Sequence, residues 1–314
     1  MKVAKTDKIF VAGHTGLVGS AIVRKLKISG YQNIILVNKK KINFLDQKKT
    51  FDFIKKIKPK FIFIAAAKVG GIYANNIFRA NFLYENLSIQ NNLIHGAYLA
   101  GVKRLIFLGS SCIYPRNSKQ PIREEYLLSG ILEKTNEPYA IAKIAGVKLC
   151  QAYNYQYKTD YKCIMPCNTY GPGDSYDKLN SHFLPSLIRK IYEIKKGKKK
   201  ILELWGTGKS KREFIYVDDL ADACIYFMNK KTKNYLINIG TGKDHSILNT
   251  AKIALNILNL KCQIFFDKKK IDGTPRKVLD VSIAKKLGWK SKTSLKDGLL
   301  KTYNYYLKQK KLSD

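Results

Sequence analysis

Two side chains in the middle of the sequence have types and spacing that suit proton transfer coupled to hydride transfer. Tyr139 and Lys143 stand four residues apart, just after Pro138, and a helix there places both on one face. An ammonium next to a phenol stabilises the phenolate, so we expect Lys143 to lower the pKa of Tyr139. Tyr139 would then exchange a proton with a substrate oxygen while the hydride moves.

The Tyr-x-x-x-Lys spacing alone carries no information in this lysine-rich chain, where chance produces about as many copies as are found. The copies start at Tyr139, Tyr192, Tyr226 and Tyr306. Only Tyr139 begins a helix that follows the segment 109–115, at the carboxyl end of a predicted strand. Parallel sheets place their ligands at that edge, and Ser110 there would hydrogen-bond the reacting carbonyl.

A thiol and an imidazole form a second candidate pair. Cys112 lies two residues after Ser110, where a nearby cation or helix dipole would turn its thiol into a proton shuttle. The partner acid would be His182, because an imidazole titrates near neutral pH. The alternative for Cys112 is an inert buried side chain, which is our interpretation of the other five cysteines. Spacing leaves this choice open.

The segment 13–19 is rich in glycine and lies between the first predicted strand and the first predicted helix. In that position glycines allow a tight turn, close approach of a pyrophosphate and close packing of helix on strand. Free N–H groups at the helix N-terminus attract the phosphates. This order predicts a dinucleotide site formed by Gly13, His14, Thr15, Gly16, Leu17, Val18 and Gly19.

The residues after the second predicted strand indicate which dinucleotide binds. An acidic side chain there would hold the ribose hydroxyls of NAD, but the chain has Lys39 and Lys40. Lysines suit a 2′-phosphate, so the sequence favours NADP; NAD stays the alternative because lysine is abundant throughout the chain. Asp46, at the start of the next helix, either caps that helix or faces the adenine.

Alternating strands and helices must position these side chains. Strands without polar residues are typical of a parallel sheet covered on both faces. Apolar runs begin at residues 9, 34, 61, 105 and 163, and they alternate with helical spacing at 21–26, 51–57, 82–100 and 138–157. We expect a Rossmann-like, doubly wound α/β domain over residues 1–173, with returning segments near 213–242. A smaller substrate-binding α/β lobe would cover 174–314, with a frayed tail from Lys308.

The composition of the chain indicates its partners and its cellular compartment. Its 314 residues include 58 basic and 23 acidic ones, a net charge of +35, but only eight of the basic residues are arginines. The excess suggests an acidic partner; since arginine is scarce, dispersed solvated lysine is the favoured interpretation. The longest apolar run, 61–67, is too short to cross a bilayer. Six dispersed cysteines show no metal-ligand spacing and indicate a reduced, cytoplasmic protein.

Taken together, these segments resemble the extended short-chain dehydrogenase/reductase family, and within it the GDP-L-fucose synthases. The likeness runs from about residue 8 to residue 307, and its most specific parts are the Cys112 segment and the segment 272–277. It rests on the stretches 11–14, 65–72, 109–115, 136–146, 180–182, 205–208, 212–214 and 272–277.

The resemblance implies a two-part reaction on one sugar nucleotide. Cys112 and His182 would be the base and acid that invert carbons 3 and 5 of GDP-4-keto-6-deoxy-D-mannose. Ser110, Tyr139 and Lys143 would hold the keto oxygen during the NADPH-dependent reduction of carbon 4, which gives GDP-L-fucose.

The resemblance also implies the residues that hold the ligands, and a homodimer. NADP(H) would be lined by Leu108, Gly109, Ser110, Ser111, Pro166, Cys167, Asn168, Thr169 and His182, together with Tyr139 and Lys143. The GDP-sugar would be held by Lys190, Trp205, Arg212, Asp272 and Lys277.

Two other classes of protein compete with this interpretation. One is a different nucleotide-sugar epimerase or dehydratase of the same superfamily, but a dehydratase usually has acidic residues where this chain has Ser111 and Cys112. The other is a nucleic-acid-binding protein driven by the net charge. Such a protein needs clustered basic and aromatic residues, whereas the lysines here are dispersed. We therefore expect neither a nucleic-acid nor a membrane partner.

Overall fold

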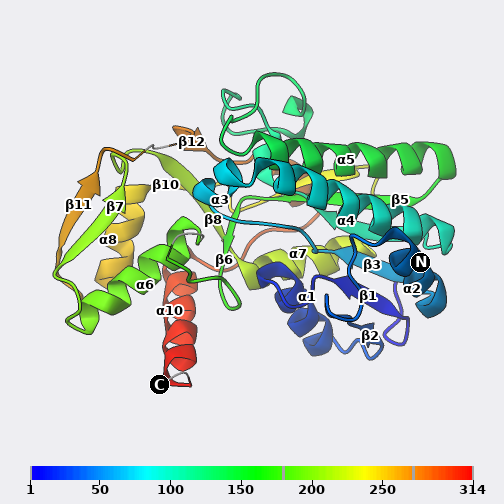
Figure 1. Ribbon diagram of the computed structural model, residues 1–314, viewed down its shortest axis with the longest axis horizontal. Helices are drawn as coiled ribbons and strands as arrows, with labels where there is room; N and C mark the ends of the chain where they lie inside the picture. Colours follow the sequence, from blue (N-terminus) through cyan, green and yellow to red (C-terminus); the bar gives the residue numbers. More distant parts are fainter. Residues whose placement is uncertain (1, 179–180, 271–272, 313–314) are drawn as a thin grey trace.

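The computed structural model describes residues 2–178, 181–270 and 273–312, which form two lobes of unequal size (Figure 1). The larger lobe contains a six-stranded parallel sheet in the order β2-β1-β3-β4-β5-β9. Its strands are β1 (Ile9–Ala12), β2 (Ile34–Ile35), β3 (Phe61–Ile64), β4 (Arg104–Leu108), β5 (Asp160–Pro166) and β9 (Leu236–Ile239). The predicted Rossmann-like α/β sheet is thus confirmed, although β2 is shorter than the apolar run around it.

Helices cover both faces of this sheet. On one face α4 packs between α2 and α5, and on the other α1 packs against α7 (Figure 1). These helices are α1 (Leu17–Ile28), α2 (Gln47–Ile57), α4 (Arg79–Leu99), α5 (Glu137–Tyr157) and α7 (Val217–Asn229), with the short α3 (Ile72–Ile77) and α9 (Ser282–Lys286) at the rim. Because both faces are covered, every residue of β1 and β3 is buried.

One glycine sets how closely α5 approaches the sheet. A Cβ at Gly146 would lie 2.5 Å from the Phe107 ring and 2.8 Å from Gln90 Oε1. No side chain fits there, so α5 packs directly on β4 and on α4. This contact fixes the height of Tyr139 and Lys143, both on α5, above the end of β4.

The smaller lobe has its own hydrophobic core, made by side chains of residues 170–216 and 251–306. In Figure 1 it lies at the left, beyond β8. A sheet in the order β10-β8-β12, with β6 beside β8, joins it to the larger lobe, and β7 pairs with β11. Its elements are β6 (Asn168–Tyr170), α6 (Phe183–Lys195), β7 (Ile201–Trp205), β8 (Lys211–Tyr216), β10 (Asp244–Ser246), α8 (Ile247–Ile257), β11 (Gln263–Asp267), β12 (Arg276–Lys277) and α10 (Leu295–Lys311). The domain boundary at residue 173 stays a prediction.

The expectation of a frayed tail from Lys308 is wrong, because α10 continues to Lys311. Ser294 caps its first turn, where its Oγ accepts a hydrogen bond of 3.1 Å from Asp297 N. Tyr303 and Tyr306 are buried in the smaller core. Lysines in the last turn lie at the negative end of the helix dipole. Packing and capping therefore outweigh the polar composition of the tail.

A buried carboxylate holds the junction of the two lobes together. Glu213 Oε1 accepts hydrogen bonds of 2.6 Å from Thr241 N and of 2.6 Å from Gly242 N, and Oε2 accepts one of 2.8 Å from Leu279 N. Glu213 is fully buried. Its carboxylate thus ties β8 to the turn after β9 and to the segment that follows β12.

We expect Glu213→Ala to destabilise the protein by about 3 kcal/mol, because three buried N–H groups lose their acceptor. Urea unfolding followed by circular dichroism measures this loss. The control is Glu125→Ala, whose carboxylate is exposed and pairs with Arg123; it should cost less than about 0.5 kcal/mol. Equal stability of the two variants would contradict the role of Glu213.

Candidate active site

The glycine turn between β1 and α1 has the geometry of a phosphate cradle. Gly13 has a φ of 86°, and a Cβ there would lie 2.5 Å from Ala66 N. A Cβ at Gly19 would collide with Gly13 O. Gly16 caps α1 without a side-chain hydrogen bond, and the first turn carries no acidic residue, so its N–H groups remain available to an anion. The buried His14 Nδ1 also has no partner among the described residues, so the turn fits a dinucleotide.

The lysines expected to select the 2′-phosphate lie in an exposed turn after β2. Neither Lys39 nor Lys40 forms an ion pair with a described residue. Their turn is held by a hydrogen bond of 2.9 Å that Lys41 N donates to Asn38 Oδ1. Asp46 caps α2, where its Oδ1 accepts 2.9 Å from Lys49 N. Of the two roles considered for Asp46, the structure supports capping.

The end of β4 brings the expected catalytic segments together. Lys143 Nζ donates a hydrogen bond of 2.8 Å to Leu108 O, which joins α5 to the last residue of β4. Ser110 Oγ then accepts 3.3 Å from Cys112 N and starts the 3-10 helix Ser111–Ile113. Gly109 packs closely on Met165, since a Cβ there would displace the end of the Met165 side chain. Ser110 and Cys112 are thereby held beside the start of α5.

The structure reverses one electrostatic expectation. The Lys143 Nζ lies 5.9 Å from the Tyr139 ring centroid, yet burial raises the pKa of Tyr139 well above its usual value. Burial also lowers the pKa of Lys143 to about 8. Removing both groups from water disfavours the charge on each of them, and Lys143 directs its ammonium to Leu108 O. Tyr139 is therefore a protonated phenol, suited to donating a proton.

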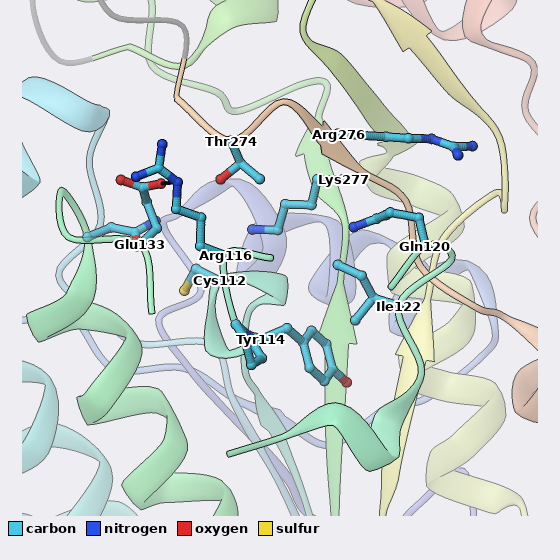
Figure 2. A pocket seen from close by; sticks show the side chains of 11 residues that line it. Cys112, Tyr114, Arg116, Gln120, Ile122, Glu133, Thr274, Arg276 and Lys277 are labelled. Carbon is cyan, nitrogen blue, oxygen red and sulfur yellow. Dashed lines mark ion pairs between the residues drawn. The ribbon is translucent and has the colours of Figure 1, made fainter. Parts of the chain in front are cut away.

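Cys112 and Lys277 line one cavity of about 20 Å³, here called the Cys112 cavity (Figure 2). Burial raises the pKa of the Cys112 thiol; the positive charge of Lys277, a hydrogen bond with Ser110 and the charge of Lys143 oppose that rise. Burial in turn lowers the pKa of Lys277. The Lys277 ammonium thus favours the thiolate form of Cys112. Residues that line the cavity are Cys112, Tyr114, Pro115, Arg116, Gln120, Ile122, Glu133, Asn136, Thr274, Arg276 and Lys277.

The pairing of β12 with β8 places Lys277 at this cavity, although Lys277 is far from Cys112 in the sequence. In β12, Lys277 stands opposite Arg212 of β8. The next residue, Val278, donates 2.9 Å from its N to Gln120 Oε1, while Ile122 N donates 2.8 Å to Val278 O. The loop after Cys112 and the segment after Lys277 therefore hold each other in register.

His182 lies apart from this cavity in the part of the chain that the structure describes. It is the N-cap residue of α6, and part of its side chain is exposed to solvent. The protein that surrounds the rest of the ring lowers the pKa of its imidazole by desolvation. The structure thus brings Cys112, Ser110, Tyr139 and Lys143 together but does not place His182 in contact with Cys112.

The expected GDP-sugar residues are distributed over the smaller lobe. Lys190 Nζ donates 2.7 Å to Glu203 O of β7, which brings α6 to that strand. Trp205 ends β7 with about half of its surface exposed, and Lys270 Nζ lies 5.4 Å from its ring centroid. Arg212 is the neighbour of Lys277 in the β8–β12 pair. Asp272 lies outside the described residues.

The segment 166–169, expected to line the cofactor, follows the carboxyl end of β5. Cys167 is buried, and Thr169 Oγ1 donates 3.2 Å to its carbonyl oxygen. Asn168 Nδ2 donates 2.9 Å to Glu213 O and so connects this segment to β8. These contacts place it at the same sheet edge as Ser110, since β4 and β5 are adjacent and parallel.

Sequence reasoning missed most of the polar wall of the Cys112 cavity. Arg116, Gln120 and Glu133 lie in the loop between Cys112 and α5, and Thr274 comes from the segment before β12. Asn136 and Thr274 fell within stretches that carried the family resemblance, but neither was assigned a role from the sequence. No spacing in the sequence connects these loops, because the cavity forms only when both lobes pack.

Two possible features find no counterpart in the described residues. Three or more His, Cys, Asp or Glu side chains do not gather there in a group that could hold a metal ion. None of the helices in the described ranges is long and apolar enough to cross a membrane. All six cysteines are free thiols.

Comparison with known proteins shows the relatives of this chain. The family model described as NAD dependent epimerase/dehydratase family matches residues 9–240. The chain is 49% identical over 304 residues to GDP-L-fucose synthase 1 of Arabidopsis thaliana, covering 97% of this chain and 94% of that protein. It is 45% identical over 310 residues to GDP-L-fucose synthase of Escherichia coli, covering 96% and 97%. A GDP-L-fucose synthetase of Naegleria fowleri bound to NADP superposes with a TM-score of 0.91 at 26% identity, covering 99% and 96%.

The position of Lys277 predicts the reactivity of Cys112. In Lys277→Met we expect iodoacetamide to alkylate Cys112 several-fold more slowly at pH 8, because the thiol pKa rises when the neighbouring positive charge is lost. Peptide mass spectrometry measures the rate at Cys112 itself. The control is Lys285→Met, an exposed lysine of α9. Equal rates in both variants would show that Lys277 does not act on the thiol.

Proposed function

The chain belongs to the NAD-dependent epimerase/dehydratase family, and we propose that it converts GDP-4-keto-6-deoxy-D-mannose to GDP-L-fucose by 3,5-epimerisation followed by 4-keto reduction. It is an NADP(H)-dependent enzyme. The GDP-L-fucose synthases among its relatives span nearly the whole chain, which favours this reaction over the other nucleotide-sugar epimerase and dehydratase activities.

One observation supports this reaction most directly: a thiol lies on the same short segment as the serine of the reductase site. Ser110 Oγ accepts a hydrogen bond from Cys112 N, and the charge of Cys112 acts on both Tyr139 and Lys143. A simple 4-keto reduction needs Ser110, Tyr139 and Lys143 only. A base beside them suits a substrate whose carbons next to the carbonyl are also inverted.

Epimerisation follows from the acidity of protons next to a ketone. The 4-keto group acidifies the protons on carbons 3 and 5, and the Cys112 thiolate removes one of them in each inversion. The resulting enolate places negative charge on the carbon-4 oxygen, which Ser110 and Tyr139 stabilise by hydrogen bonds. Our proposal assigns to His182 the proton that returns to the opposite face, since its lowered pKa makes the imidazolium a ready donor.

Reduction uses the same oxygen and the same hydroxyl groups. NADPH supplies the hydride to carbon 4, and the residues proposed to line it are the glycine turn 13–19, Lys39, Lys40 and the segments 108–111 and 166–169. Tyr139, whose raised pKa keeps it protonated at rest, donates its proton to the carbon-4 oxygen as the arriving hydride makes that oxygen basic. The Lys143 ammonium compensates the phenolate that this transfer leaves behind.

Binding of the GDP-sugar is assigned to cations and an aromatic ring of the smaller lobe. We place the diphosphate against Lys190 and Arg212, and the guanine against the exposed Trp205 face. Asp272, in the same proposal, accepts hydrogen bonds from the nucleotide or sugar. Lys277 is assigned to the sugar end of the substrate, because it lines the Cys112 cavity.

The proposal extends to the setting in which the enzyme works. We place it in the cytoplasm as a homodimer, with neither a membrane nor a nucleic-acid partner. Exposed apolar side chains on the adjacent helices α4 and α5 support a dimer; they are Tyr84, Leu99, Ile141 and Tyr155. Six free cysteines are consistent with a reducing compartment.

The proposed reaction is tested with purified protein, GDP-4-keto-6-deoxy-D-mannose and NADPH. We expect NADPH oxidation to match formation of GDP-L-fucose, identified by chromatography and mass spectrometry. Absence of turnover with both NADPH and NADH would contradict the proposal. Reduction without inversion of carbons 3 and 5 would contradict the epimerase part alone.

Two variants separate the half-reactions. Cys112→Ser should lower deuterium exchange from D₂O into the substrate by at least about a hundredfold, because a serine hydroxyl, unlike a thiol, does not ionise to an anionic base near neutral pH. Tyr139→Phe should lower hydride transfer by about a hundredfold or more and deuterium exchange by much less, because Ser110 still stabilises the enolate oxygen. NMR of the sugar measures exchange, and absorbance measures NADPH. Normal exchange in Cys112→Ser would show that another group is the base.

The buried lysine predicts the alkaline limb of the pH profile. Burial lowers the pKa of Lys143 to about 8, so its charge is present below that pH and is lost as the pH rises through it. Cys112 and Cys163 are the groups whose negative charge opposes this lowering. We expect kcat for reduction to fall above pH 8. In Lys143→Arg, whose guanidinium stays charged, the residual rate should show no such fall; a fall at the same pH would exclude Lys143 as its cause.

A further inference from the structure

The Cys112 cavity contains two buried acceptor atoms that no described residue satisfies. They are Glu133 Oε2 and Asn136 Oδ1. Buried polar atoms in folded proteins are nearly always paired, and an unpaired one in a cleft indicates a ligand group or water. Neither atom has a role in the mechanism derived above.

Glu133 is held in place without being satisfied. Arg116 Nε lies 3.2 Å from Glu133 Oε2 as an ion pair but is not aligned to donate a hydrogen bond to it. The other oxygen, Oε1, has only long contacts of 3.5 Å with the N and Oγ1 of Thr135. Figure 2 shows the Arg116–Glu133 pair on the wall beside the Cys112 side chain. The Arg116 guanidinium thus compensates the negative charge of Glu133, while Glu133 Oε2 still lacks a hydrogen-bond donor among the described residues.

Asn136 is fixed by its backbone at the start of α5. Its N donates 3.1 Å to Glu133 O, and its carbonyl oxygen accepts 3.0 Å from Ala140 N. Its side chain makes no capping hydrogen bond to the helix. Asn136 therefore lines the cavity on a rigid backbone, three residues from Tyr139, with its Oδ1 buried and unpaired among the described residues.

Two other polar side chains of the cavity direct their donors elsewhere. Arg276 is engaged with Asp244 at 2.6 Å, and Gln120 Nε2 donates 3.3 Å to Ser118 O. The cavity, at about 20 Å³, admits water-sized groups and not a whole sugar ring. Hydroxyl groups on the edge of a ring have the required size and donate hydrogen bonds to a carboxylate or an amide oxygen.

The hexose of the proposed substrate has two free hydroxyls, on carbons 2 and 3. Carbon 1 carries the nucleotide, carbon 4 is the ketone, carbon 5 bears the ring oxygen and carbon 6 is a methyl group. We propose that the Cys112 cavity recognises this hydroxyl edge, with Glu133 Oε2 and Asn136 Oδ1 each accepting a hydrogen bond from one of the two hydroxyls. This inference rests on the proposed function.

The recognition has a consequence for catalysis. The carbon-3 hydroxyl is attached to the same carbon as one of the protons that Cys112 removes. Two hydrogen bonds to the hydroxyl edge therefore orient the ring relative to the thiolate. A sugar that lacks one hydroxyl leaves a buried acceptor unpaired, and such sites reject the deficient analogue strongly.

The test compares three substrates with two variants. The substrates are GDP-4-keto-6-deoxymannose and its 2-deoxy and 3-deoxy analogues, and the variants are Asn136→Leu and Glu133→Met, neither of which keeps a side-chain oxygen. We expect the wild type to use each deoxy analogue at least about tenfold less efficiently, as kcat/KM. Each variant should lower kcat/KM for the full substrate and lose most of the discrimination against one analogue.

Matched controls separate recognition from folding. Asn136→Asp keeps an acceptor at the same place and should retain discrimination, and Glu125→Gln changes an exposed carboxylate outside the cavity. The inhibition constant of GDP should stay within twofold in all variants, because the cavity contacts the sugar and not the nucleotide. A variant that binds GDP normally is folded at the nucleotide site.

Two results would overturn the inference in distinguishable ways. In the first, the wild type turns over the full substrate and both variants keep full discrimination against both analogues. Other residues then recognise the hydroxyls, and the proposed function still holds. If the wild type does not oxidise NADPH with the full substrate, the proposed function fails and this inference fails with it.

Discussion

The hydrogen bond from Lys143 Nζ to Leu108 O is the contact on which the site depends most. It joins the start of α5 to the carboxyl end of β4, and so sets Tyr139 beside Ser110 and Cys112. Burial makes this bond chemically consequential, because it lowers the pKa of Lys143 to about 8 and raises that of Tyr139. The close packing of α5 on β4, which Gly146 allows, therefore sets the positions of Tyr139 and Lys143 in the proposed reductase site. The burial that comes with it shifts the pKa of both side chains.

The second half of the site depends on chain segments that are remote in sequence. Glu213 gathers three backbone N–H groups from the turn after β9 and from the segment after β12. That arrangement places Lys277 next to Arg212 and against Cys112. The thiol and the cation that favours its ionised form thus come from different lobes, so the proposed epimerase site forms only in the assembled fold.

Only a few of the positive charges in this chain have a local function. The net charge of +35 suggested a large acidic partner, yet only a few of the described lysines have a pKa lowered by desolvation, and two of these, Lys143 and Lys277, act on the charge of Cys112. Desolvation distinguishes them from solvated lysines, because a charge removed from water interacts strongly with its neighbours. The acidic partners in our proposal are two phosphorylated small molecules.

The sequence by itself determined the parallel sheet and the glycine turn, because alternating apolar runs encode the strands and the turn lies between a strand and a helix. The position of Ser110 and Tyr139 after a predicted strand, and not their spacing, singled out the segment with Cys112 and the pair with Lys143. The sequence did not determine the continuation of α10 to Lys311, which tertiary burial of Tyr303 and Tyr306 stabilises. Nor did it determine the sign of the Tyr139 pKa shift or the polar wall with Glu133 and Asn136. Desolvation and the meeting of distant loops arise only when the chain packs, so only the tertiary structure decided them.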